Sequence, residues 1–97
     1  MPTNHPAEAQ TLHIMGLVQH ALGDREQALD YLQRALRIRE TLLAKDDRIV
    51  GTTCYELSVV HAERDDEYPV ALSYAQRALN IFQIKLPPKY TKLQRVA

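Results

Sequence analysis

The chain has 97 residues, of which 45% are hydrophobic and 25% are charged, a composition typical of one globular domain and not of a disordered segment. Twelve basic side chains balance twelve acidic ones, so the chain lacks the excess positive charge on which non-specific binding to nucleic acid or to a membrane surface depends. It contains three glycines, too few for a turn-rich all-β domain.

The cysteine content and the apolar segments bear on the cellular compartment. Cys54 is the single cysteine, so no disulfide can form within the chain, and we expect a reducing environment. The amino-terminal stretch has neither the basic start nor the uninterrupted apolar run of a signal peptide. No later segment approaches the ~20 apolar residues that cross a bilayer. We therefore expect a cytoplasmic protein.

The first predicted helix covers about Ala9 to Leu22. Its apolar residues recur every three or four positions, which is a helical period, and the repeating set is Leu12, Met15, Val18 and Leu22. Pro6 is expected in the first turn, where its missing N–H has no partner to lose. Gly23 can adopt the left-handed conformation that ends helices, and Asp24 can cap the next helix, which should fold back antiparallel.

The second predicted helix covers about Arg25 to Lys45. Its apolar stripe consists of Ala28, Leu32, Ala35, Leu36 and Leu42. Asp30 and Arg34 form a pair at i,i+4 that stabilises a helix by ~0.2 to 0.5 kcal/mol. Arg34, Arg37 and Arg39 form a modest basic patch, which we interpret as a solvent-exposed helix face.

Two more helices follow. Asp46 and Asp47 can cap a third helix that runs to about Glu63, with buried positions expected at Val50, Cys54, Leu57, Val60 and His61. The polar run 63–67 ends this helix. A fourth helix is predicted from about Pro69 to Lys85, with the proline in its first turn, and the prolines at 87 and 88 stop it. The start of a fifth helix is predicted in 90–97.

The sequence contains an internal repeat. Residues 28–38 read ALDYLQRALRI and residues 71–81 read ALSYAQRALNI, with eight of eleven positions identical. The offset is 42 in the first helix of each pair and 43 in the second, so the extra residue falls in the second turn. The pattern predicts an all-α chain of two antiparallel hairpins, 5–45 and 46–86, followed by a linker and the truncated start of a third unit, or a cap, at 87–97.

Small residues stand at equivalent points of the two units, where stacked helices must cross closely. Gly16 corresponds to Ser58 in the first helix of each hairpin, and alanines recur in the second helix at 28, 35, 71 and 78. Met15 and Leu57, and Leu32 and its smaller counterpart Ala75, are expected to fill the space between the helices. The duplication is therefore interpreted as structural.

These residues resemble tetratricopeptide repeats, in particular the roughly 42-residue repeats of the kinesin light chain type. The resemblance covers about Asn4 to Leu93 and rests on Leu12, Met15, Gly16, Gly23, Ala28, Leu32 and Ala35 in the first unit, and on Cys54, Leu57, Ser58, Ala71 and Ala78 in the second. It implies a right-handed α-solenoid that binds proteins or peptides. Neither first helix contains a lysine or an asparagine, so the terminal-carboxylate clamp of co-chaperone repeats is not expected.

The candidate binding residues are those that the first helix of each unit would present on the concave side of such a solenoid. They are Gln10, His13, Leu17 and His20 in the first unit and Thr52, Tyr55, Val59 and Ala62 in the second. Their mixture of apolar and hydrogen-bonding groups suits an extended or helical peptide. A neutral, partly aromatic groove points away from strongly charged partners.

Catalytic and metal-binding alternatives have weaker support. His13, His20, Cys54, Glu56 and His61 are of types that bind zinc, but they show no paired ligand spacing. Cys54 occupies a packing position, and no phosphate loop or nucleophile elbow is present. We therefore expect no enzyme activity, no cofactor and no metal.

Two functional hypotheses remain open. The first is a non-catalytic scaffold that binds a protein or peptide segment. The second is a structural module that self-associates through the exposed face of its last repeat, where Leu79, Phe82 and Leu86 would otherwise lack cover, or a fragment of a longer repeat array.

Overall fold

The computed structural model describes residues 5–85 of the chain. These residues form four α-helices and one short 3₁₀ helix: α1 (Pro6–Ala21), α2 (Arg25–Leu42), α3 (Arg48–His61), η1 (Asp65–Glu67) and α4 (Tyr68–Lys85). The all-α prediction is therefore confirmed. The predicted linker and third-unit start at 87–97, and Leu86 before it, lie outside the described residues.

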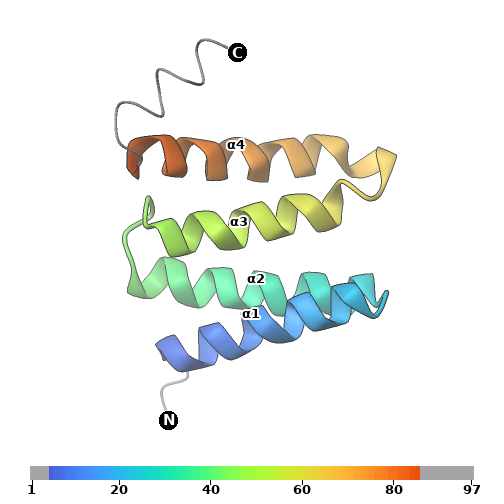
Figure 1. The fold of residues 1–97 in the computed structure, drawn as a ribbon, viewed down its shortest axis with the longest axis horizontal. Coiled ribbons are helices and arrows are strands. Elements are labelled where there is room, and N and C mark those ends of the chain that lie inside the picture. Colours follow the sequence, from blue (N-terminus) through green and yellow to red (C-terminus); the bar gives the residue numbers. More distant parts are fainter. Residues whose placement is uncertain (1–4, 86–97) are drawn as a thin grey trace.

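The helices follow one another in space in their chain order (Figure 1). α1 packs against α2, α3 packs against α4, and α2 joins the two pairs by packing against α3, while α1 and α3 touch over a smaller area. The α1–α2 and α3–α4 turns lie at one end of the molecule, and the α2–α3 connection lies at the other (Figure 1). The two predicted hairpins are thus present, and the handedness of their superhelix stays a prediction.

The residues expected to start the helices do so. The Asp24 side chain accepts a hydrogen bond from the Gln27 N–H at 3.1 Å, and Asp47 accepts one from the Ile49 N–H at 2.9 Å. Gly23 has the left-handed φ of 88° that lets the chain reverse between α1 and α2. The first hairpin therefore turns, and the second begins, where the capping residues indicate.

The end of α2 was predicted three residues too late. The helix ends at Leu42, and Leu43 continues in an extended conformation with φ −123° and ψ 165°. Leu43 still packs against the main core. The apolar pattern of α2 therefore continues past the end of the helix, which is why the sequence predicts a longer one. α3 also stops at His61, before the predicted Glu63.

The core lies between α2, α3 and α4. Its buried residues are Leu32, Leu36, Val50, Cys54, Leu57, Val60, Ala78 and Ile81. A second, smaller cluster joins α1 to α2 through Ala9, Leu12, Ala35 and Ile38. The predicted buried stripes are therefore correct at their centres.

The described helices include none that is long and apolar enough to cross a membrane.

Four residues assigned to the buried stripes are instead substantially exposed: Met15, Val18, Leu22 and Leu42. The first three belong to α1 or its end, and α1 has described neighbours on one side only. Leu42 is the last residue of α2, where the chain leaves the core. The prediction that Met15 fills the space between helices is therefore wrong, whereas its counterpart Leu57 is fully buried.

Candidate functional site

The eight predicted groove residues lie in three different environments. Gln10 and His13 belong to a polar cluster around Arg39. Val59 and Ala62 line a hollow between α3 and α4. The remaining four lie elsewhere on the first helices of the two hairpins, with Thr52 and Tyr55 exposed and Leu17 and His20 half-buried.

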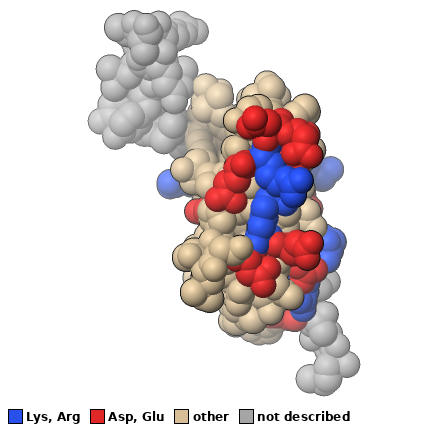
Figure 2. Space-filling model, turned by 90° about the vertical axis from the view of Figure 1, so that its right-hand side faces the viewer, with Lys and Arg blue, Asp and Glu red and all other residues tan. Residues whose placement is uncertain are grey.

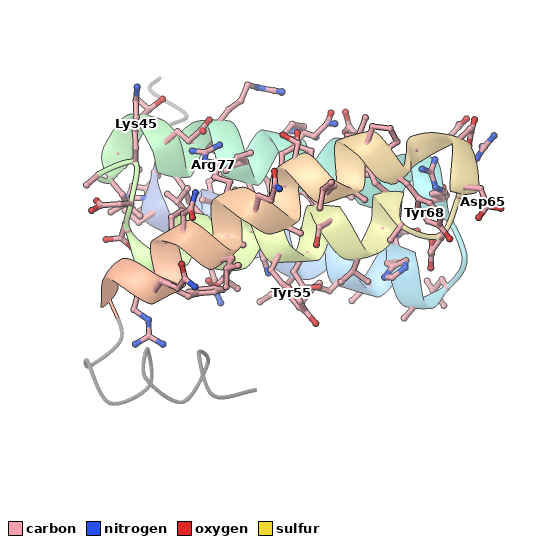
Figure 3. All side chains as sticks on the ribbon, turned by 90° about the horizontal axis from the view of Figure 1, so that it is seen from above. Lys45, Tyr55, Asp65, Tyr68 and Arg77 are labelled. Atoms are coloured by element: carbon pink, nitrogen blue, oxygen red, sulfur yellow. The ribbon has the colours of Figure 1, made fainter. Side chains whose placement is uncertain are left out.

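Tyr55 is the largest candidate side chain that is open to solvent. It is 52% exposed, and Figure 3 shows it projecting from α3 on the side away from Arg77. Within residues 5–85 no hydrogen bond engages its hydroxyl, and its backbone carbonyl accepts a bond from the Ser58 hydroxyl at 2.6 Å. An exposed aromatic ring with a polar tip is a frequent contact residue in protein interfaces.

Of the predicted basic patch, Arg34 and Arg37 are exposed, but Arg39 does not lie on the solvent-exposed helix face, so the prediction is wrong for Arg39. The residue is only 7% exposed. Its Nη1 donates to Thr53 Oγ1 at 2.8 Å and to His13 Nδ1 at 3.2 Å, and its Nη2 donates to Gln10 Oε1 at 2.9 Å. The guanidinium therefore joins α1, α2 and α3 in one buried polar cluster.

His13 is part of that cluster rather than of an open groove surface, since it is 7% exposed. Burial lowers the pKa of His13, and the positive charge of Arg39 lowers it further. The imidazole is therefore neutral near pH 7 and accepts the Arg39 hydrogen bond through Nδ1. Its ring orients the arginine and is poorly placed to meet a ligand directly.

A second polar cluster joins the two hairpin turns. His20 Nε2 lies 2.6 Å from Glu63 Oε2, and Glu67 is bonded both by Arg25 and by His61, whose Nδ1 lies 2.7 Å from Glu67 Oε1. Figure 2 looks at this end of the molecule, where basic and acidic side chains alternate on the surface. These contacts hold the start of α2 to the segment before α4.

Glu67 is ionised more readily than an ordinary glutamate. The hydrogen bond from His61 lowers the pKa of Glu67, and Arg25 acts in the same direction, whereas burial opposes both. His61 also stacks on Tyr74 with ring centroids 5.7 Å apart. His61, the last residue of α3, therefore both packs as an aromatic ring against Tyr74 and bonds Glu67 as a polar group.

The hollow between α3 and α4 has a volume of about 660 Å³ and almost entirely apolar walls. Its lining includes Val59, Ala62, Tyr68, Leu72 and Ala75. Tyr68 and Leu72 are 54% and 57% exposed. This face of the second hairpin can accommodate an apolar partner segment.

The zinc-type residues do not assemble into a site. Within residues 5–85, no three His, Cys, Asp or Glu side chains are grouped so that they could hold a metal ion. Cys54 is fully buried, and burial raises the pKa of its thiol, which is the behaviour of a packing cysteine and not of a nucleophile.

Sequence reasoning missed Arg39 and the carboxylates Glu63 and Glu67. One signal was available for Arg39, which lies three and seven positions after Leu36 and Leu32 and so shares their apolar stripe. The two glutamates stand in a polar run that was interpreted as a helix stop, and their partners Arg25 and His20 are more than forty residues away. No local pattern indicates such a pairing.

Comparisons with known proteins bear on the whole arrangement. The chain matches the protein-family model described as tetratricopeptide repeat over residues 7–84, which includes all four described helices almost entirely. Among curated proteins, none matches the chain significantly.

Proposed function

The chain belongs to the tetratricopeptide repeat family, and on that premise we propose that it is a scaffold that binds an extended or helical peptide on the face formed by α1 and α3. Repeats of this family are typically non-catalytic modules for protein interaction. The offsets of 42 and 43 residues between its two units support the further assignment to repeats of the kinesin light chain type.

The observation that carries the proposal is the exposed ring of Tyr55 on α3. Thr52 is exposed one turn before it, so the two side chains share one strip of helix surface. One turn after Tyr55 this strip meets the α3–α4 hollow at the half-buried Val59. Such a strip offers an aromatic anchor, a hydroxyl and an apolar contact to a peptide.

Tyr55→Ala tests the proposal. Peptides selected by the wild-type chain from a random phage-displayed library are labelled, and their binding to both proteins is measured by fluorescence anisotropy. Loss of an aromatic anchor is expected to weaken binding by about tenfold or more. The substitution lies at a surface position, so helix content and melting temperature should change little.

Tyr68→Ala is the matched control. Tyr68 is 54% exposed, almost as much as Tyr55 at 52%, but it lies at the start of α4 beside the α3–α4 hollow (Figure 3). If the peptide binds to the α1–α3 face, Tyr68→Ala should bind it as tightly as the wild type does. If Tyr68→Ala weakens binding and Tyr55→Ala does not, the peptide lies against α4, and the proposal is wrong.

The second candidate function is self-association through the exposed face of the second hairpin. Leu72 and Leu79 on α4 are 57% and 48% exposed. They are seven residues apart and so share one side of the helix, and Leu72 lines the apolar hollow. Large exposed apolar patches usually mark surfaces that bind another molecule. A second copy of the chain would cover them without any further ligand.

A further inference from the structure

Arg39 adjoins a small cavity at the end of the molecule where α2 leads into α3. The cavity has a volume of about 220 Å³, which is several times the ~30 Å³ share of one water molecule and smaller than an ordinary drug-sized pocket. Its apolar walls come from three segments, with Pro6 and Ala9 on α1, Leu42 and Leu43 at the end of α2, and Ile49 on α3. Gln10 and Arg39 supply the polar part of the lining.

The charge of Arg39 is held by neutral groups alone. Its three hydrogen-bond acceptors are a hydroxyl, an amide oxygen and a neutral imidazole. Among the ion pairs formed within residues 5–85, none includes Arg39. Arg39 is 7% exposed, and no carboxylate of residues 5–85 pairs with its guanidinium. Such burial is costly, because the three neutral acceptors orient the guanidinium but leave its charge unneutralised.

We propose that the cavity beside Arg39 is a binding site for a carboxylate carried on a short apolar stem. The carboxylate would meet the guanidinium, and the stem would lie against the apolar walls at Ala9, Leu43 and Ile49. One buried positive charge matches one negative charge, so a monoanion is favoured over a doubly charged phosphate in these apolar surroundings. The size of the cavity suits a group as large as an amino-acid side chain.

This site goes beyond the peptide face built around Tyr55. It arises from the second helix of the first hairpin, and its proposed ligand is charged, unlike the partners expected for the groove of the first helices. Two sources could supply the same chemistry, namely a free carboxylic acid and a carboxylate of a peptide, either in a side chain or at the carboxyl terminus.

Titration of the full chain with butyrate, followed by NMR, tests the proposal on the wild-type protein. We expect saturable shifts of the Arg39 Nε–H signal and of the backbone amides of Ala9, Leu43 and Ile49. The neutral isostere butyramide should bind about tenfold or more weakly, since a hydrogen bond to a charged group contributes about 1.5 to 3 kcal/mol. Equal binding of the two compounds, or preferential binding of inorganic phosphate at the same ionic strength, overturns the proposal.

Arg39→Met removes the charge and keeps the length of the side chain. Replacing an uncompensated buried charge with an apolar group is often neutral or stabilising, so the variant should fold, and it should bind butyrate about tenfold or more weakly. Arg37→Met is the matched control, because Arg37 is exposed on the same helix, and it should bind like the wild type. Butyrate affinity that survives Arg39→Met overturns the proposal.

Two peptide arms identify the source of the carboxylate. An amidated peptide with one internal glutamate and a glutamate-free peptide with a free carboxyl terminus are titrated in the same way, and the one that competes with butyrate carries the natural group. If neither competes while butyrate binds, the source is a free acid. Tyr55→Ala should leave butyrate binding unchanged, so failure of the peptide-face proposal and failure of this one remain distinguishable.

Discussion

Gly16 and Leu32 show how the two helices of the first hairpin approach each other. A Cβ on Gly16 would lie 2.8 Å from Leu32 Cγ and 3.1 Å from Leu32 Cδ2, which is too close for real contacts. At the equivalent points of the second hairpin the sizes are exchanged, with Ser58 in place of the glycine and Ala75 in place of the leucine. One hairpin thus combines a glycine with a large residue, and the other combines a serine with a small one.

This complementarity predicts a coupling between two substitutions. Gly16→Ser should destabilise the chain by about 1 to 3 kcal/mol through overpacking, and Leu32→Ala should destabilise it by about 2 to 5 kcal/mol because Leu32 is fully buried. The double variant should lose less free energy of unfolding than the sum of the two single losses, because removal of the leucine side chain makes room for the serine. Urea denaturation of the four proteins measures the coupling, and strictly additive values would contradict it.

At the scale of the elements, the two hairpins are joined at both ends of α2. Arg25, in its first turn, bonds Glu67 of η1, and Glu40, near its last turn, lies 2.5 Å from Arg77 of α4. Arg39 adds the buried bond to Thr53 of α3. α2 is therefore the element through which the first hairpin holds the second.

The bond between His61 and Glu67 predicts a pH dependence of stability. The pKa of Glu67 lies below its usual value of 4.5 in the folded chain, so the unfolded chain binds the proton more readily, and stability rises with pH across this range. The stabilisation from Glu67 is complete above its unfolded pKa and is lost as the pH falls through the folded value. Glu67→Gln should therefore lower the melting temperature near neutral pH and have little effect in strong acid.

Asp66→Asn is the control for this prediction. It removes one negative charge from the same segment, but Asp66 is exposed and is paired only loosely, at 3.6 Å from Arg64. Melting temperatures measured from pH 7 down to about pH 3 compare the three proteins. A separation between wild type and Glu67→Gln that stays constant over this range, or grows towards acid, would contradict the assignment.

The sequence predicts the elements better than it predicts their polar partners. Helix starts depend on local groups such as Asp24 and Asp47, which act within three residues, so they can be read directly from the chain. The end of α2 cannot, because Leu43 continues the apolar pattern from an extended backbone. The position of Arg39 on the stripe of Leu32 and Leu36 indicates burial. Its hydrogen-bond acceptors, however, lie 14 to 29 residues away, and no local pattern encodes which groups they are.

The same limit applies to the candidate binding residues. Seven of the eight lie in the first helix of a hairpin, as helical spacing predicts, whereas Ala62 follows the last residue of α3. Helical spacing also treats all eight as one surface. His13 is drawn into the interior by Arg39, and Val59 and Ala62 face the hollow that α4 forms with α3. Which side of a helix is covered depends on the packing of its neighbours, and this is a property of the assembled hairpins.

At the scale of the whole molecule, the apolar face of α4 predicts self-association that depends on concentration. A closed dimer in which this face meets itself would cover Leu72 in both copies. Sedimentation velocity from micromolar to submillimolar concentration should show the wild type shifting towards a dimer, and Leu72→Glu should remain a monomer, because a buried unpaired charge opposes the contact.

Ile14→Glu is the companion variant, since Ile14 is 48% exposed on α1, the helix at the other end of the row from α4 (Figure 1). A dimer formed by the α4 face alone should persist in this variant. A wild-type chain that stays monomeric at every concentration contradicts self-association. Disruption by Ile14→Glu as well as by Leu72→Glu would indicate head-to-tail contacts instead of a closed dimer.

The positions of Arg25 and Arg39 on α2 have a consequence for mechanics. Fourteen residues of helix separate them, which is about 21 Å at 1.5 Å per residue, and each bonds directionally to the second hairpin. The apolar contacts between them would tolerate sliding, but a shift by one helical turn, about 5.4 Å, would break the bonds at both ends together. The two contacts of α2 therefore fix how far the two hairpins are shifted relative to each other along the helix axis. In a longer array, the same contacts would set the pitch.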